Sequence, residues 1–297
     1  MKHIVIGSRG SDLALWQANF VKGELEKLGC TVTIEIIKTQ GDIIQHLSFD
    51  KLEGKGFFTK EIEAALLNGS IDLAVHSHKD LETNPPEGLV ISCVSERANP
   101  SDVLLVNRSS VDPSEKWFLK ANAAVGTSSA RRKTQVLKYR PDLTIVDLRG
   151  NVPTRIDKLR KGNYDAILLA KSGLDRLGLD LSEFKEVVLD PSEFVPAPAQ
   201  GVLGLQIRSK DDELHSILQN INFPEVQKCI SLERKVLNLL EGGCQLPLGV
   251  YCNTNHDLFV SLANASGKCI SLNYKVTDFN GMAEKVVADL NEKLSLV

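Results

Sequence analysis

The sequence predicts an α/β protein in which two α/β units precede a small α+β domain. Short apolar runs alternate with amphipathic stretches up to about residue 210, which is the pattern of strands joined by helices. Beyond that point, one long amphipathic stretch is followed by three β-rich runs. A chain of 297 residues is long enough for two or three such domains.

The first unit reads as a βαβαβ alternation, which favours a mostly parallel sheet covered by helices. Leu15, Phe20, Leu25 and Leu28 recur at helical spacing in its first amphipathic stretch. In chain order, the expected elements are strand 4–7, helix 12–28, strand 31–38, helix 60–68 and strand 73–76. The long polar segment 41–58 carries glycines near both ends, which predicts a mobile, hinged loop.

The second unit begins after Asn99-Pro100 and repeats the alternation. Its expected strands are 103–106, 123–126, 144–147 and 166–170. The proline-rich run 191–201 predicts a stiff connector, and we expect strand 202–207 to return to the first sheet. The predicted domains are therefore 1–99 with about 197–217, then 100–196, and finally 218–297.

The last domain differs in its order of elements. An amphipathic helix over 225–241 ends at Gly242-Gly243. The remaining expected elements are strands 250–253, 258–263 and 269–276 and a closing helix 283–294. Strands followed by a helix indicate a small α+β domain.

Composition and charge restrict the class of protein. The chain is 42% hydrophobic and 25% charged, as in ordinary globular proteins, and its net charge of −3 argues against a general nucleic-acid binder. The first residues read as a core strand rather than a signal peptide, and no segment is long and apolar enough to cross a membrane. The six cysteines form no CxxC pair. We therefore expect a cytoplasmic protein with reduced thiols.

Arginines concentrate at two turns that favour anions. The segment 126–132 contains Arg131 and Arg132, and the segment 148–155 contains Arg149 and Arg155. Each reads as a strand ending in a polar turn that opens a helix, where backbone N–H groups and the helix dipole favour negative charge. The hydroxyls of residues 127–129 can cap the first helix, Asn151 is the expected cap of the second, and Pro153 suits a first helical turn. Solvated surface arginines are the alternative for any one of them.

Further polar residues follow other predicted strands at the edge where a parallel sheet binds ligands. Arg9 follows the first strand, and Arg176 follows the run 166–170. Asp80 ends the run 76–80, where it serves either as an ionised carboxylate for catalysis or as a turn cap. His76 and His78 have no acidic or cysteine partner at ligand spacing, so we expect no metal site.

Cys244 stands between two glycines and a proline, just past a predicted helix. A constrained, exposed turn suits a reactive or modified thiol, although a buried structural role is the commoner fate of cysteine. The sequence has no GxxxxGK[ST], GxGxxG or HExxH motif, which removes the commonest nucleotide and zinc-protease interpretations.

Taken together, these segments resemble the porphobilinogen deaminase (hydroxymethylbilane synthase) family of tetrapyrrole biosynthesis. The likeness rests on residues 6–9, 13–18, 54–58, 76–80, 126–132, 148–155, 164–170 and 241–245. The resemblance implies a monomeric transferase that joins four porphobilinogen units head to tail, with loss of ammonia, and releases a linear tetrapyrrole by hydrolysis. It also implies two similar α/β domains, related to periplasmic binding proteins, and a small C-terminal domain that carries the cofactor cysteine.

The resemblance also implies a role for each candidate residue. Cys244 would hold a dipyrromethane cofactor through a thioether, and Asp80 matches the catalytic aspartate. The other implied cofactor-binding residues are Ser77, Lys79, Thr127, Ser129, Arg131 and Arg132. The implied substrate-binding residues are Arg9, Ser11, Gln17, Arg149, Arg155 and Arg176. Residues 41–58 match a mobile loop over the site.

Two other function classes predict different sequence features. A non-catalytic anion-binding protein of the same fold predicts an export signal, a dispensable cysteine and no third domain. A regulatory ligand-binding domain predicts a helix-turn-helix segment before the first strand. The sequence shows neither an export signal nor a helix-turn-helix segment before the first strand.

Overall fold

The computed structural model describes residues 2–40, 59–241, 246–264 and 266–295. The predicted loop 41–58 and Cys244 lie outside these residues. The chain divides into two compact units. One comprises Met1–Ala98 and Gly201–Lys228, and the other comprises Asn99–Gln200 and Cys229–Val297.

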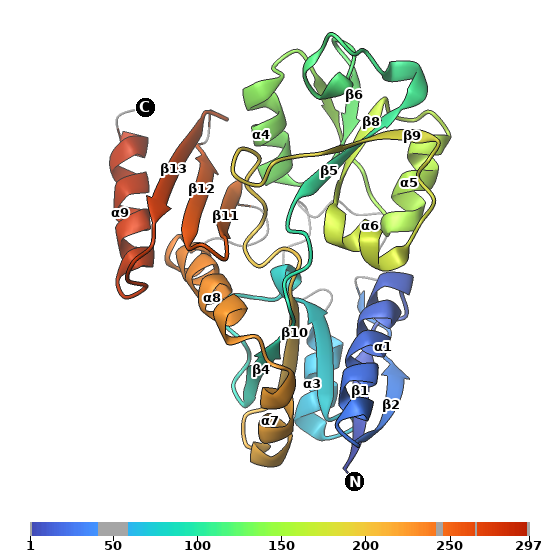
Figure 1. The fold of residues 1–297 in the computed structure, drawn as a ribbon, viewed down its shortest axis with the longest axis vertical. Helices are drawn as coiled ribbons and strands as arrows, with labels where there is room; N and C mark the ends of the chain where they lie inside the picture. The colour runs from blue at the N-terminus through green and yellow to red at the C-terminus, as the bar shows by residue number, and fades with distance from the viewer. Residues whose placement is uncertain (1, 41–58, 242–245, 265, 296–297) are drawn as a thin grey trace. The chain divides into compact units, whose positions relative to one another are not determined.

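The first unit is built on a five-stranded sheet with strand order β2-β1-β3-β10-β4 (Figure 1). Its strands are β1 (His3–Ser8), β2 (Thr31–Ile36), β3 (Leu73–Ser77), β4 (Leu89–Val94) and β10 (Leu203–Arg208). Its helices are α1 (Asp12–Lys27), α3 (Lys60–Asn68) and α7 (Asp212–Leu218). Apolar side chains from α1, α7 and the strands form one core, and α3 packs on a second, so helices cover both faces of the sheet.

The second unit contains a five-stranded sheet with strand order β7-β6-β8-β5-β9. Its strands are β5 (Asp102–Asn107), β6 (Ala124–Gly126), β7 (Thr144–Val146), β8 (Ala166–Ala170) and β9 (Phe184–Val188). Its helices are α4 (Ala130–Tyr139), α5 (Val152–Arg160) and α6 (Lys171–Leu177). Two separate apolar clusters lie against this sheet, one including α4 and the other including α5 and α6.

The two five-stranded sheets share one topology. In each, three neighbouring strands are parallel, and the fourth strand is antiparallel to both of its neighbours. The fourth strand is β10 in the first sheet and β5 in the second. The prediction that the strand near residues 202–207 joins the first sheet is confirmed, and the two α/β domains are similar in the sense predicted.

A three-stranded antiparallel sheet, β11-β12-β13, forms the last part of the second unit. Its strands are β11 (Leu248–Cys252), β12 (Asp257–Ala263) and β13 (Cys269–Lys275), and its last helix is α9 (Met282–Ser295). Helix α8 (Pro224–Leu239) begins in the first unit and enters the second at Cys229. Helix α9 lies along this sheet (Figure 1), and its apolar face shares a core with α8 and the strands. This part is the small α+β arrangement that the sequence predicts.

Two strands were not predicted, and the sheets are less parallel than expected. Strand β4 has the sequence LVISCV, an apolar run that sequence reasoning missed. Strand β9 carries Lys185 and Glu186 in its middle, which interrupts its apolar pattern. The antiparallel direction of β5 and β10 is set by where each strand enters its sheet, and local sequence does not encode that.

Candidate active site

The turn after β6 is organised as a helix N-terminus. The Ser129 hydroxyl caps α4 by accepting a hydrogen bond from the backbone N–H of Arg132 at 3.4 Å. The Thr127 hydroxyl accepts a hydrogen bond from the Ser129 N–H at 3.2 Å. The predicted cap is confirmed, and the dipole of α4 favours an anion at this end.

The turn after β7 has the same form. The Asn151 side chain caps α5 by accepting a hydrogen bond from the Thr154 N–H at 3.0 Å, and Pro153 lies in the first helical turn. The Arg155 Nε donates to the Gly150 carbonyl at 2.7 Å, which holds this arginine against the turn. The cap at Asn151 and the position of Pro153 agree with the sequence-based expectation.

A reciprocal pair of hydrogen bonds joins the two turns. The Ser128 hydroxyl donates to the Leu148 carbonyl and accepts from the Leu148 N–H, each at 3.0 Å. Because β6 and β7 are parallel neighbours, their carboxyl ends meet at one edge of the sheet. The arginines of the two turns, which are separated in sequence, are thereby brought to the same edge.

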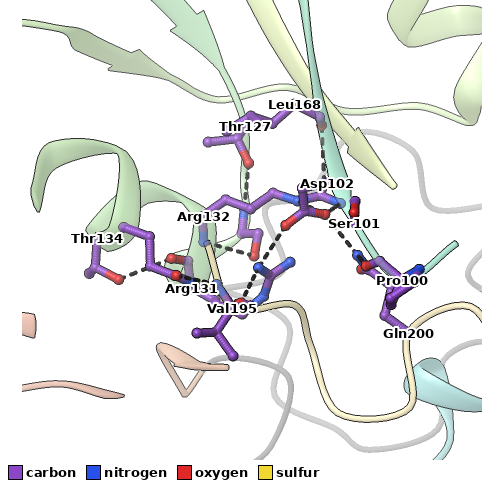
Figure 2. Close-up of polar contacts among 12 residues, drawn as sticks. Pro100, Ser101, Asp102, Thr127, Arg131, Arg132, Thr134, Leu168, Val195 and Gln200 are labelled. Atoms are coloured by element: carbon purple, nitrogen blue, oxygen red, sulfur yellow. Dashed lines mark hydrogen bonds and ion pairs between the residues drawn. The ribbon is translucent and has the colours of Figure 1, made fainter. Parts of the chain in front are cut away.

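Arg131 and Arg132 are buried side by side on a shared carboxylate, that of Asp102 on β5 (Figure 2). One Arg131 Nη donates to an Asp102 oxygen at 2.7 Å and to the Val195 carbonyl at 2.9 Å. Arg132 donates to the other oxygen through Nη at 2.8 Å and through Nε at 3.2 Å. Its remaining Nη donates to the carbonyl of Leu168 at 3.0 Å.

The charges of this cluster do not balance. Burial opposes ionisation of Asp102, but its two arginine partners outweigh burial and hold the pKa of the carboxyl well below its usual range. Burial lowers the pKa of Arg131, although Asp102 opposes that effect. Arg131 and Arg132 are only 4% and 6% exposed, so two cations share one anion in a nearly dry environment. Such a site favours an additional anionic ligand.

Asp102 and Gln200 are parts of this cluster that sequence reasoning missed. The Gln200 side chain donates to Asp102 at 2.9 Å and to the Pro100 carbonyl at 2.7 Å, and it is fully buried. A signal for Asp102 existed, because it is the one charged residue of strand β5 and directly precedes the apolar run 103–106. A charged residue in such a strand needs a buried partner of opposite charge.

In the first unit, several candidate residues surround a cavity of about 90 Å³. Arg9 follows the end of β1, and Asp80 follows the end of the parallel neighbour β3. The predicted residues that line the cavity are Arg9, Ser11, Gln17, Ser77 and Asp80. The Gln17 amide donates to the Ser77 hydroxyl at 2.8 Å, which joins helix α1 to the end of β3.

Asp80 lies in the short 3-10 segment His78–Asp80, directly after β3. The Asp80 side chain is exposed, and that of Lys79 is half-buried. The exposed carboxylate is therefore available to a ligand at the cavity, whereas the strand before it is buried. Ser11 also lines the cavity, and its hydroxyl caps α1 by accepting a hydrogen bond from the Ala14 N–H.

The structure thus gathers the candidate residues into two groups, one in each unit. The cavity residues form the first group, and the residues at the ends of β6, β7 and β8 form the second. Arg176 belongs to the second group, on α6 after β8, and burial lowers its pKa to about 10, so it stays charged at neutral pH. Among the described residues, no cluster of metal-ligating side chains is found. No helix in the described part of the chain could cross a membrane.

Two family models cover most of the chain. The model for the dipyrromethane cofactor binding domain of porphobilinogen deaminase matches residues 4–216, and the model for the C-terminal domain of the same enzyme matches residues 227–295. The chain belongs to the porphobilinogen deaminase family. The family resemblance of the sequence motifs is therefore confirmed.

Two curated relatives named porphobilinogen deaminase agree with the family models. Porphobilinogen deaminase of Nitratidesulfovibrio vulgaris is 49% identical over 252 residues, which are 84% of this chain and 78% of the relative. The enzyme of a Geobacter species is 41% identical over 300 residues, covering 99% of this chain and 92% of the relative. A solved periplasmic binding protein of Salmonella typhimurium is 10% identical with a TM-score of 0.41, covering 78% of this chain and 94% of that one.

The family binds a dipyrromethane cofactor, whose carboxylates are anions that Arg131 and Arg132 could hold. Each pyrrole of such a group bears carboxylates, and the cluster has one more positive charge than negative charge. Arg131 uses only one Nη for its hydrogen bonds to described residues, whereas a guanidinium has five N–H donors. The capped N-terminus of α4 lies beside it. The chemistry of these donors fits a carboxylated pyrrole.

Proposed function

We propose that this chain joins porphobilinogen units one at a time, head to tail, with Asp80 as its catalytic residue and Cys244 as the attachment point of its cofactor. Four condensations with loss of ammonia, followed by hydrolysis, give hydroxymethylbilane. The observation that carries the proposal is the cavity of the first unit, where the exposed carboxylate of Asp80 stands with Arg9, Ser11 and Gln17. Within this family, that arrangement supports a site for a carboxylated pyrrole.

Asp80 acts on the electron-poor pyrrole that remains when ammonia leaves. A carboxylate that accepts a hydrogen bond from the pyrrole N–H stabilises the developing positive charge. Its exposure at the end of β3 allows a substrate to reach it directly. In this proposal, the same carboxylate serves every condensation.

The arginines bind the carboxylates of substrate and product. Arg9, with Ser11 and Gln17, orients the incoming porphobilinogen at the cavity. Arg149, Arg155 and Arg176 bind the acetate and propionate groups of the lengthening chain at the ends of the strands of the second unit. A guanidinium holds a carboxylate through two parallel hydrogen bonds. Each arginine therefore orients the pyrrole ring that carries the carboxylate as well as attracting it.

A second set of residues holds the cofactor. When bound through the Cys244 thioether, the dipyrromethane supplies the terminal pyrrole carbon to which the first substrate is joined. In the second unit, the residues proposed to bind its carboxylates are Arg131 and Arg132, with Thr127 and Ser129 at the capped helix end. In the first unit, the same role is proposed for Ser77, the last residue of β3, and for Lys79 in the 3-10 segment that follows. Cys244 itself lies outside the described residues.

We further propose a cytoplasmic monomer with no nucleic-acid or membrane partner. The net charge of −3 supports the absence of a nucleic-acid partner, since such proteins normally carry a surplus of basic residues. The substrate is a small, anionic pyrrole.

The ratio of products tests the proposed function. The purified chain, incubated with porphobilinogen, should release four molecules of ammonia for each hydroxymethylbilane, because one is lost at each condensation. Ammonia and the linear tetrapyrrole are measured in the same sample. Binding of porphobilinogen with no ammonia release would instead support the alternative, a non-catalytic anion-binding protein of the same fold.

A further inference from the structure

Three buried polar side chains form a hydrogen-bonded chain that begins at the lining of the first unit's cavity. His76 on β3, Gln206 on the neighbouring strand β10 and Glu63 on α3 are 7%, 1% and 8% exposed. His76 Nε2 is 3.0 Å from Gln206 Oε1. Gln206 Nε2 donates to a carboxylate oxygen of Glu63 at 3.1 Å.

The chemistry of the three groups fixes the tautomer of the histidine. A carboxylate accepts hydrogen bonds, so Glu63 holds the NH₂ group of Gln206 on its own side. The amide oxygen of Gln206 then faces the imidazole, and His76 Nε2 must carry the proton. Burial lowers the pKa of His76 to about 4, so the ring is neutral at neutral pH. Its other nitrogen, Nδ1, therefore keeps a lone pair as a hydrogen-bond acceptor.

This lone pair belongs to a residue that lines the cavity. In the described ranges, the only hydrogen bond found for the His76 ring is the one at Nε2. Thr59 also lines the cavity, and its hydroxyl is a buried group with no hydrogen-bond partner within the described structure. Two residues of the cavity lining thus carry neutral acceptors that protein groups in the described ranges do not use.

We infer that His76 Nδ1, together with the Thr59 hydroxyl, accepts hydrogen bonds from the protonated aminomethyl group of porphobilinogen. The inference rests on the proposed function and extends it to the group that leaves as ammonia. Arginines bind the substrate carboxylates and Asp80 binds the pyrrole N–H, which leaves the ammonium as the remaining donor of the substrate. A buried ammonium needs acceptors, and a neutral imidazole supplies one. Gln206 and Glu63 are positioning residues that fix the tautomer.

Two substitutions at residue 76 separate this contact from a structural role. The amide of His76→Asn reaches the position of Nδ1, whereas that of His76→Gln reaches the position of Nε2 and can keep the bond to Gln206. We expect His76→Gln to raise KM for porphobilinogen by about ten- to one-hundredfold, the loss typical of a hydrogen bond to a charged group, with a much smaller change in kcat. His76→Asn should stay close to the unaltered chain. If His76 had only a structural role, His76→Gln would stay close to the unaltered chain and His76→Asn would be the more impaired variant.

A substrate analogue and a second variant complete the test. A porphobilinogen analogue with methyl in place of aminomethyl should inhibit the unaltered chain and His76→Gln equally well, since it lacks the ammonium. An unchanged KM in His76→Gln, or an equal loss of affinity for the analogue, would overturn the inference. If His76→Gln does not fold, Thr59→Val is the substitute, because it is nearly isosteric: we expect a KM raised several-fold, and an unchanged KM would overturn the inference.

Failure of this inference is distinguishable from failure of the proposed function. Ammonia release by the unaltered chain tests the reaction. The order of the two His76 variants, measured on a protein that turns over, tests only the contact with the ammonium.

Discussion

Replacing Asp80 with asparagine should lower kcat by about a thousandfold or more while leaving the fold intact. The substitution keeps the size of the side chain but removes the charge that stabilises the electron-poor pyrrole, and electrostatic groups of this kind contribute about 10²–10³ in rate. A carboxylate that also guides a proton adds to that loss. Asp80 is exposed at the end of β3, so little packing depends on it. Turnover is measured by ammonia release, and the fold by circular dichroism.

Asp212→Asn is the matched control for this variant. Asp212 is also an exposed aspartate of the first unit, at the start of α7, and it does not line the cavity. The kcat of Asp212→Asn should equal that of the unaltered chain. Near-normal turnover by Asp80→Asn would remove Asp80 from the mechanism.

Replacing Asp102 with asparagine should lower the free energy of unfolding by about 3–5 kcal/mol. The substitution leaves Arg131 and Arg132 buried without their shared anion, and an uncompensated buried charge is expensive. Unfolding in urea at neutral pH measures the loss. Glu284→Gln is the control, because it breaks an exposed ion pair with Lys235 and should leave the unfolding midpoint nearly unchanged. Equal stability of Asp102→Asn and the control would contradict this account of the cluster.

The direction of the pKa change gives the pH range of this effect. The folded-state pKa of Asp102 lies below its ordinary value of 3.8. Its contribution to stability is therefore fully present above that value and is lost as the pH falls through the folded-state pKa. The difference between Asp102→Asn and the unaltered chain should be constant near neutral pH and should narrow in strong acid.

Local sequence signals predicted much of the candidate site. The two turns carry their own cap residues, Ser129 and Asn151, because capping depends on a few neighbouring side chains. The positions of Arg9 and Asp80 followed from parallel strands, whose carboxyl ends share one edge of a sheet. These inferences need only a short stretch of chain and the rule that parallel strands point the same way.

Long-range partners could not be predicted in the same way. Asp102 lies 29 residues before Arg131, and Gln206 lies 130 residues after His76. Each pairing depends on how the strands enter the sheets, and no local pattern indicated that β5 and β10 run antiparallel to their neighbours. Sequence reasoning therefore identified the charged groups of the second unit but not the buried carboxylate that holds two of them.

The mass of the purified protein tests the central claim most directly, namely that the chain carries its own covalent cofactor. The sequence accounts for 32.6 kDa, and the unaltered protein should exceed its sequence mass by one dipyrromethane. Peptide fragmentation should place the added mass on Cys244, and Cys244→Ser should have the mass of its sequence and no turnover. An unaltered protein that is fully active with no added mass would contradict the account.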